Sequence, residues 1–182
     1  MRIDRLPLGG AHLIVRDPHQ DPRGRFARLY CRNELGSLGI DAVAQINHSV
    51  TRSVGTVRGM HFQHAPHAEN KLIACLKGRV FDVMVDLRGD SPTFLRWHGV
   101  ELCAQDHLTV HVPRGFAHGF QVLEPDSELH YVHDAFYAAD HEAVVNATDP
   151  RIAIAWPLAV SEISDRDRSA PFLGDGFRGV SW

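Results

Sequence analysis

The stretch KLIACLKGRVFDVMVDLRGDSPT, residues 71–93, decides the fold class. Two runs rich in apolar and β-branched residues flank Lys77-Gly78, a pair typical of a hairpin turn. One face of the second run carries Phe81, Val83, Val85 and Leu87, and the other carries Asp82, Met84 and Asp86. This alternation is the period of a β-strand. We expect the apolar face in the core, and the acidic face against solvent or a polar cavity.

The segments around this stretch extend the β pattern. Further strands are predicted at 11–16, 94–102, 107–112 and 128–137, with a loop at 17–25 and a Pro/Gly corner opening 113–120. In ELHYVHDAFY, Leu129, Tyr131 and His133 fall on one face. Only 31–40 and the segment after Asp149 read as short helical turns. The sequence therefore predicts an all-β, double-sheet jelly roll or a barrel, as one domain over 1–182 with short helical turns in its terminal arms.

Composition narrows the function classes. The 182 residues are 44% hydrophobic and 23% charged, with a formal net charge of -3 and no Lys/Arg run, so we expect no nucleic-acid partner. No apolar run is long enough for a membrane span, and MRIDRLPLGG lacks the apolar core of a secretory signal. Cys31, Cys75 and Cys103 are widely spaced, which predicts neither a disulfide framework nor a zinc knuckle. We expect a cytoplasmic protein.

Residues 55–71, GTVRGMHFQHAPHAENK, gather titratable side chains in a region of strands. Burying such groups is costly unless they are paired, so the stretch predicts a site. One hypothesis is a metal-binding cupin whose ligands are His61, His64, Glu69 and His118. Its weakness is spacing, because His61 and His64 differ by three positions and face opposite sides of a regular strand.

A second hypothesis is acid–base chemistry. A neutral His61 imidazole suits proton abstraction near neutral pH, with a carboxylate holding its second ring nitrogen. Tyr131, on the inward face of its strand, is a plausible acid. Three arginines, Arg23, Arg58 and Arg166, would suit a pyrophosphate if the fold brought them together, although each alone is typical of a solvated surface charge.

The motifs together resemble the dTDP-4-dehydrorhamnose 3,5-epimerases of nucleotide-sugar metabolism. The resemblance rests on PRGRF at 22–26, QINHS at 45–49, VRGMHFQ at 57–63, residues 70–94, PRGFAHGF at 113–120, and the spacing of Tyr131, Tyr137 and Glu142. It continues through DPRIAIAWP and ISDRDRSAPFL, and so covers nearly the whole chain. It implies a cupin-type jelly roll that works without metal or other cofactor, usually as a homodimer.

The resemblance also implies roles for individual residues. His61 would remove the sugar proton, paired with Asp167, and Asp82 is a second candidate for that support. Tyr131 would protonate the opposite face, with Lys71 near the C4 oxygen. Tyr137 would stack on the nucleotide base. The expected contacts to nucleotide or sugar are Arg23, Arg28, Gln45, Asn47, Arg58, His118, Glu142 and Arg166. On this reading His64, His67 and Glu69 are bystanders.

The chain departs from the family pattern after Arg23, where Arg25 and Arg28 stand in place of the usual Phe and Glu. The reversed charge at Arg28 bears on the choice of substrate. The expectation is epimerisation of a nucleotide-linked 4-keto-6-deoxy sugar at C3 and C5. A C3-only epimerase, an epimerase of another nucleotide sugar such as a GDP-heptose, and a non-catalytic sugar-nucleotide binder remain alternatives.

Overall fold

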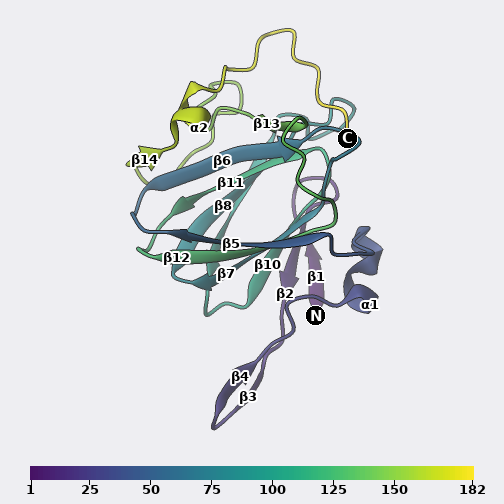
Figure 1. Ribbon diagram of the computed structural model, residues 1–182, viewed down its shortest axis with the longest axis vertical. Coiled ribbons are helices and arrows are strands. Elements are labelled where there is room, and N and C mark those ends of the chain that lie inside the picture. Colours follow the sequence, from purple (N-terminus) through teal and green to yellow (C-terminus); the bar gives the residue numbers. More distant parts are fainter.

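The computed structural model describes residues 1–182 and consists mainly of two facing β-sheets (Figure 1). The first sheet has the strand order β1 (Arg2–Arg5), β2 (His12–Val15), β10 (Leu108–Val112), β7 (Lys71–Lys77), β12 (Ser127–His133) and β5 (Gln45–Thr51). The second has the order β13 (Glu142–Val144), β6 (Thr56–Gln63), β11 (Phe116–Val122), β8 (Arg79–Asp86) and β9 (Trp97–Cys103). The all-β prediction is confirmed.

Few elements lie outside these two strand orders. β14 (Glu162–Ile163) pairs in parallel with β6, and β3 (His19–Asp21) and β4 (Gly24–Phe26) pair only with each other. The hairpin of β3 and β4 projects from the body (Figure 1), where the sequence predicted a plain loop. The short helical turns are α1 (Arg32–Leu35) and η1 (Gly36–Leu38) near the N-terminus, and α2 (Asp165–Ser169) near the C-terminus. No helix has the length and apolar character that crossing a bilayer requires.

The predicted hairpin at Lys77-Gly78 is wrong. β7 and β8 lie in different sheets, so Gly78, with φ of 74°, turns the chain from one sheet to the other. A short connection between two β-rich runs has the same local sequence pattern in a hairpin and in a crossing between sheets. The inward side chains decide between them, since Ile73 of β7 and Met84 of β8 pack in one cluster between the sheets.

Both faces of β8 are buried, which the alternation alone did not predict. The face with Val83 and Val85 packs outward against the C-terminal segment, including Trp156 and Phe177. The opposite face looks into the space between the sheets, where Met84 joins the central core. Asp82, on that same inward face, is fully buried. The acidic face therefore meets the protein interior, where each carboxylate needs partners.

A β-bulge in β6 lies next to the space between the sheets. His61 pairs with His118 of β11 and Arg58 pairs with Phe120, so Gly59 and Met60 together oppose Gly119 alone. In a regular strand, residues three apart face opposite sides. The extra residue rotates the strand by one position, so that Arg58 and His61 both face inward.

Glycine at position 119 is required by this close approach. A Cβ there would lie 2.6 Å from the Met60 sulfur and 2.7 Å from the Arg58 carbonyl oxygen. We expect Gly119→Ala to lower the free energy of unfolding by about 1–3 kcal/mol through overpacking. Gly176→Ala is the matched control, because a Cβ at Gly176 meets nothing within 4 Å. Urea titrations of both variants check this, and equal midpoints would contradict the argument.

Candidate active site

A cavity of about 540 Å³ opens between the two sheets. It is lined from β5, β7 and β12 of the first sheet, from β6 and β11 of the second, and from the segment of β14 and α2. All four predicted catalytic residues line it, as do seven of the nine predicted substrate-binding residues. These seven are Gln45, Asn47, Arg58, His118, Tyr137, Glu142 and Arg166.

The two exceptions are Arg23 and Arg28, which lie outside this cavity. Arg23 sits at the turn of the projecting hairpin and pairs with Asp21 at 2.6 Å. Arg28 pairs with Glu34 at 2.7 Å. The hairpin that carries Arg23 projects from the body of the chain (Figure 1), and neither Arg23 nor Arg28 lines this chain's own cavity.

His61 and Asp167 form a hydrogen-bonded pair across 106 positions of sequence. The Nε2 atom of His61 lies 2.8 Å from Oδ1 of Asp167, on the helix α2 that covers the end of β6. The other carboxylate oxygen of Asp167 accepts from the Gly59 amide, and its own amide donates to the Ser164 side chain. An ionised carboxylate only accepts, so Nε2 carries the proton and Nδ1 is the free basic nitrogen.

The environment of Asp167 keeps it ionised. Burial alone raises the pKa of this carboxyl, but the hydrogen bond and charge of His61 and the bonds from Gly59 and Ser164 outweigh it, and the net pKa is below the usual 3.8. The alternative support for His61, Asp82, instead lies 2.7 Å from the Nε2 atom of His118. His61 and His118 thus have separate carboxylate partners.

Tyr131 lies in the sheet opposite the one that carries His61. It lies on β12, which pairs with β5 and β7, whereas His61 lies on β6 of the second sheet. Burial raises the pKa of its phenol, whose oxygen lies 3.5 Å from the Ser49 hydroxyl. A phenol kept protonated in this way can donate a proton. A base and an acid therefore stand on opposite walls of one cavity.

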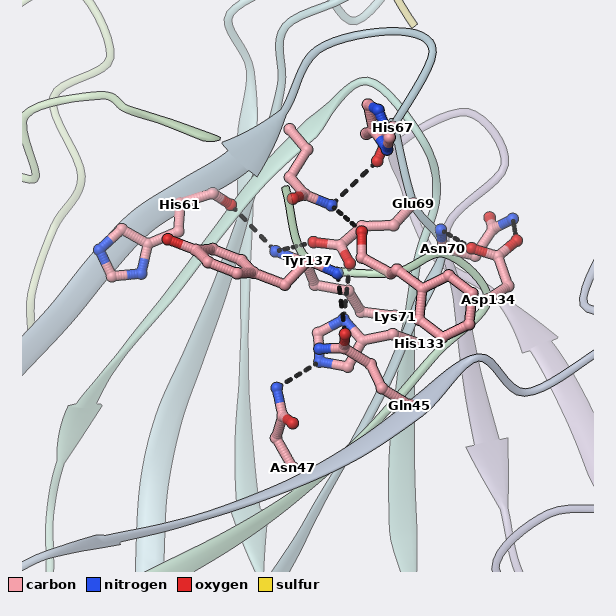
Figure 2. A network of polar contacts seen from close by, with 12 residues as sticks. Gln45, Asn47, His61, His67, Glu69, Asn70, Lys71, His133, Asp134 and Tyr137 are labelled. Carbon is pink, nitrogen blue, oxygen red and sulfur yellow. Dashed lines mark hydrogen bonds and ion pairs between the residues drawn. The ribbon is translucent and has the colours of Figure 1, made fainter. Parts of the chain in front are cut away.

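Glu69, which was expected to be a bystander, lines the cavity. Its carboxylate joins the Lys71 ammonium, at 3.2 Å, to His133, at 2.7 Å, and the Lys71 ammonium also donates to the His61 carbonyl (Figure 2). His133 lines the cavity although no role was predicted for it. The available signal was its position two residues after Tyr131, on the same inward face. The other predicted bystanders, His64 and His67, do lie outside the cavity.

The ligand set of the metal hypothesis is not brought together. Nowhere in the chain do three His, Cys, Asp or Glu side chains form a group that could hold a metal ion. His61 and His118 are each engaged by a carboxylate, and the His64 ring packs edge-on against Phe62.

The outer part of the cavity combines an exposed aromatic ring with charged groups. The Tyr137 hydroxyl donates to a Glu142 oxygen at 2.9 Å, and Arg166 contacts the same oxygen at 2.7 Å. The Tyr137 amide donates to the Gln45 side chain, which ties this segment to β5. Tyr137 is 57% exposed, so its ring can accept a flat ligand. Sequence reasoning gave no role to several further lining residues: His48, Ser49, Thr56, Glu162 and Ser164.

The lowered pKa of Asp167 predicts a pH-dependent contribution to stability. Since the folded-state pKa is below the usual 3.8, the contribution is complete above about pH 4 and is lost as the pH falls through the folded-state pKa. We expect Asp167→Asn to be less stable than the native chain by on the order of 1 kcal/mol at pH 7, with a smaller difference near pH 3. Urea unfolding between pH 3 and 7 checks this. The exposed Asp165 of the same helix, replaced in Asp165→Asn, is the control, and a gap that is constant with pH would contradict the assignment.

Comparison with known proteins shows the family to which the chain belongs. The family model described as dTDP-4-dehydrorhamnose 3,5-epimerase matches residues 5–175. A Mycobacterium tuberculosis dTDP-4-dehydrorhamnose 3,5-epimerase is 39% identical over 180 residues, which cover 96% of this chain and 89% of that protein. A Legionella pneumophila epimerase in complex with dTDP-4-keto-L-rhamnose has a TM-score of 0.91 and 33% identity, with 100% of this chain and 98% of that one covered.

A Streptomyces bikiniensis 3'-monoepimerase in complex with dTDP-quinovose has a TM-score of 0.86 and 35% identity, covering 93% of this chain and 86% of that one. The family match over nearly the whole chain agrees with the double-sheet fold and with the cavity between the sheets. The chain belongs to the dTDP-4-dehydrorhamnose 3,5-epimerase family of isomerases.

Proposed function

We propose that the protein epimerises a dTDP-linked 4-keto-6-deoxy sugar at C3 and C5 without a cofactor. The observation that carries the proposal is the His61–Asp167 pair on one wall of the cavity with Tyr131 on the other. Protons at C3 and C5 are both α to the C4 ketone. One base, one acid and one oxyanion site can therefore serve both centres in turn.

Proton abstraction is the first step. The Nδ1 lone pair of His61 takes the proton from carbon, and the electron pair of the broken C–H bond moves into an enolate with its charge on the C4 oxygen. The imidazolium that results is stabilised by Asp167, which lies 2.8 Å from Nε2. The hydrogen bonds that hold Asp167 fix the direction of the ring.

Reprotonation from the other face completes the inversion. Tyr131 donates its proton to the carbanionic carbon, and the C4 ketone re-forms. His61 then releases its proton to solvent and Tyr131 takes one up, which resets the site for the second centre. Burial raises the pKa of the Tyr131 phenol, so the group keeps its proton at neutral pH until the more strongly basic enolate forms.

Positive charge stabilises the enolate between these steps. The Lys71 ammonium lies beside the strand of the base, hydrogen-bonded to the His61 carbonyl at 3.2 Å. A preorganised cation at a developing oxyanion is among the largest contributions to catalysis. The nucleotide is assigned to the outer part of the cavity, with its base on the Tyr137 ring and its diphosphate near Arg58 and Arg166.

A second candidate is epimerisation at C3 alone. The similarity to the Streptomyces bikiniensis 3'-monoepimerase, at 35% identity, favours keeping it. Both reactions use the same base and acid. They differ in whether the sugar can present C5 as well as C3 to His61.

We propose further that the protein is a cytoplasmic homodimer. Ile46, Val50 and Leu76 are 59%, 48% and 41% exposed and lie on the outer face of the first sheet, and Phe26 on the projecting hairpin is 77% exposed. Apolar surface of this kind suits burial against a second copy. The three cysteines are free, which fits a reducing compartment.

The reaction is tested by exchange with heavy water. With dTDP-4-keto-6-deoxyglucose as substrate in heavy water, the proton NMR signals of C3 and C5 should disappear as deuterium replaces both protons. Deuterium enters because the acid re-equilibrates with solvent between steps. Deuterium at C3 alone would select the monoepimerase. No exchange at either position would reject this substrate, and the same assay with GDP-linked heptoses then tests the other nucleotide sugars.

Two substitutions test the proposed roles of the base and the acid in this assay. We expect His61→Asn and Tyr131→Phe each to lower kcat by about 10²- to 10⁴-fold, because each removes one proton-transfer group. Affinity for dTDP, measured by calorimetry, should change little. Retention of most of the rate in His61→Asn would reject the assignment of the base.

The dimer is tested by sedimentation velocity. We expect a mass of twice the 20.3 kDa chain, and a shift toward the monomer when Ile46→Lys and Val50→Lys are combined, since charges then face the partner. Val160→Lys, at an apolar site of the C-terminal segment that is 39% exposed, is the control. A native chain that sediments as a monomer at every concentration would contradict the proposal.

A further inference from the structure

A chain of polar contacts runs through the cavity from β5 to β6 and ends at the base. Asn47 lies 3.4 Å from Nε2 of His133, and Nδ1 of His133 lies 2.7 Å from one oxygen of Glu69. The other Glu69 oxygen contacts the Lys71 ammonium at 3.2 Å, and that ammonium donates to the His61 carbonyl at 3.2 Å (Figure 2).

The three central side chains are almost fully enclosed. Those of Glu69, Lys71 and His133 are only 8%, 9% and 9% exposed. A buried ammonium needs a counter-charge to remain ionised at low cost. Burial raises the pKa of the Glu69 carboxyl, but its contacts with His133 and Lys71 outweigh burial and the net pKa is lowered. Glu69 is therefore an anion at neutral pH and supplies the counter-charge.

These contacts also fix the directions in which the Lys71 ammonium and the Glu69 carboxylate point. An ammonium has three N–H donors. In Lys71, Glu69 takes one and the His61 carbonyl takes another, which leaves one donor for an oxygen in the cavity. The Glu69 carboxylate has one oxygen for each partner, so His133 prevents it from turning both oxygens toward the lysine.

We infer that Glu69 and His133 are positioning residues for Lys71 in the proposed epimerisation. Glu69 holds the ammonium, and His133 holds Glu69. The inference rests on the proposed function for its effect on rate. Without the His133 hydrogen bond, the second carboxylate oxygen is free to capture the lysine donor that would meet the C4 oxygen, so the enolate loses stabilisation.

The kinetic test is a double-mutant cycle between positions 133 and 71. His133→Phe keeps a ring of similar shape and removes the donor, whereas His133→Asn places an amide donor near the position of Nδ1. We expect His133→Phe to lower kcat on the order of tenfold with KM changed much less, and His133→Asn to recover part of the loss. In a Lys71→Met background, His133→Phe should cause no further loss.

The matched control is His130→Phe on the same strand. His130 falls on the opposite face of β12 and does not line the cavity, so its variant should keep the native kcat. Equal losses from His133→Phe with and without Lys71 would show a general structural effect and overturn the inference. A native rate in His133→Phe would overturn it as well.

A second readout needs no substrate and separates this inference from the proposed function. The chain has only two lysines, Lys71 and Lys77, so acetylation by dilute acetic anhydride can be followed by mass spectrometry with the exposed Lys77 as an internal reference. Removing the counter-charge in Glu69→Gln favours the neutral amine, which is the form that acetic anhydride labels. We expect Lys71 labelling relative to Lys77 to rise several-fold.

Unchanged labelling in Glu69→Gln would show that Glu69 does not hold Lys71, whatever the enzyme acts on. If the native protein epimerises no sugar but the labelling rises, the proposed function fails and the contact between Glu69 and Lys71 stands.

Discussion

The site depends on one irregularity, the bulge at which Gly59 and Met60 of β6 oppose Gly119 of β11. Without the extra residue, Arg58 and His61 would face opposite sides of the sheet, and only one of them could reach the cavity. The bulge also presents the Gly59 amide to Asp167. One local departure from regular pairing thus aims the proposed base, places an arginine beside it and helps to hold the carboxylate that orients the base.

Pairing of buried charge is the second constraint. Three of the four histidines that line the cavity pair with a largely buried carboxylate: His61 with Asp167, His118 with Asp82, and His133 with Glu69. The carboxylates come from a helix, a strand and a loop, so no single element supplies the site. Because an unpaired buried charge is costly, folding and site assembly are linked: the sheets close only in the arrangement that satisfies these groups.

Much of the fold, and part of the site, could be predicted from local pattern. Period-two alternation predicted that Tyr131 and His133 share an inward face, as they do. The same pattern could not tell a hairpin at Gly78 from a crossing between sheets, because that depends on partners distant in sequence. It could not predict the bulge that turns both Arg58 and His61, three positions apart, toward the cavity. Asp167 was assigned through family resemblance alone, since nothing local marks a partner 106 residues away.

The cavity has few unpaired positive charges, which suggests a role for the hairpin of β3 and β4. Of the cavity's cationic residues, Lys71 is paired with Glu69 and Arg166 with Glu142, which leaves Arg58 without a carboxylate partner. A diphosphate carries more negative charge than one guanidinium neutralises. Arg23 is 90% exposed at its side chain and lies at the turn of this hairpin. A second copy whose hairpin reached across would bring Arg23 to this cavity as a further positive charge. The proposed dimer would in this way balance more of the negative charge of the proposed substrate.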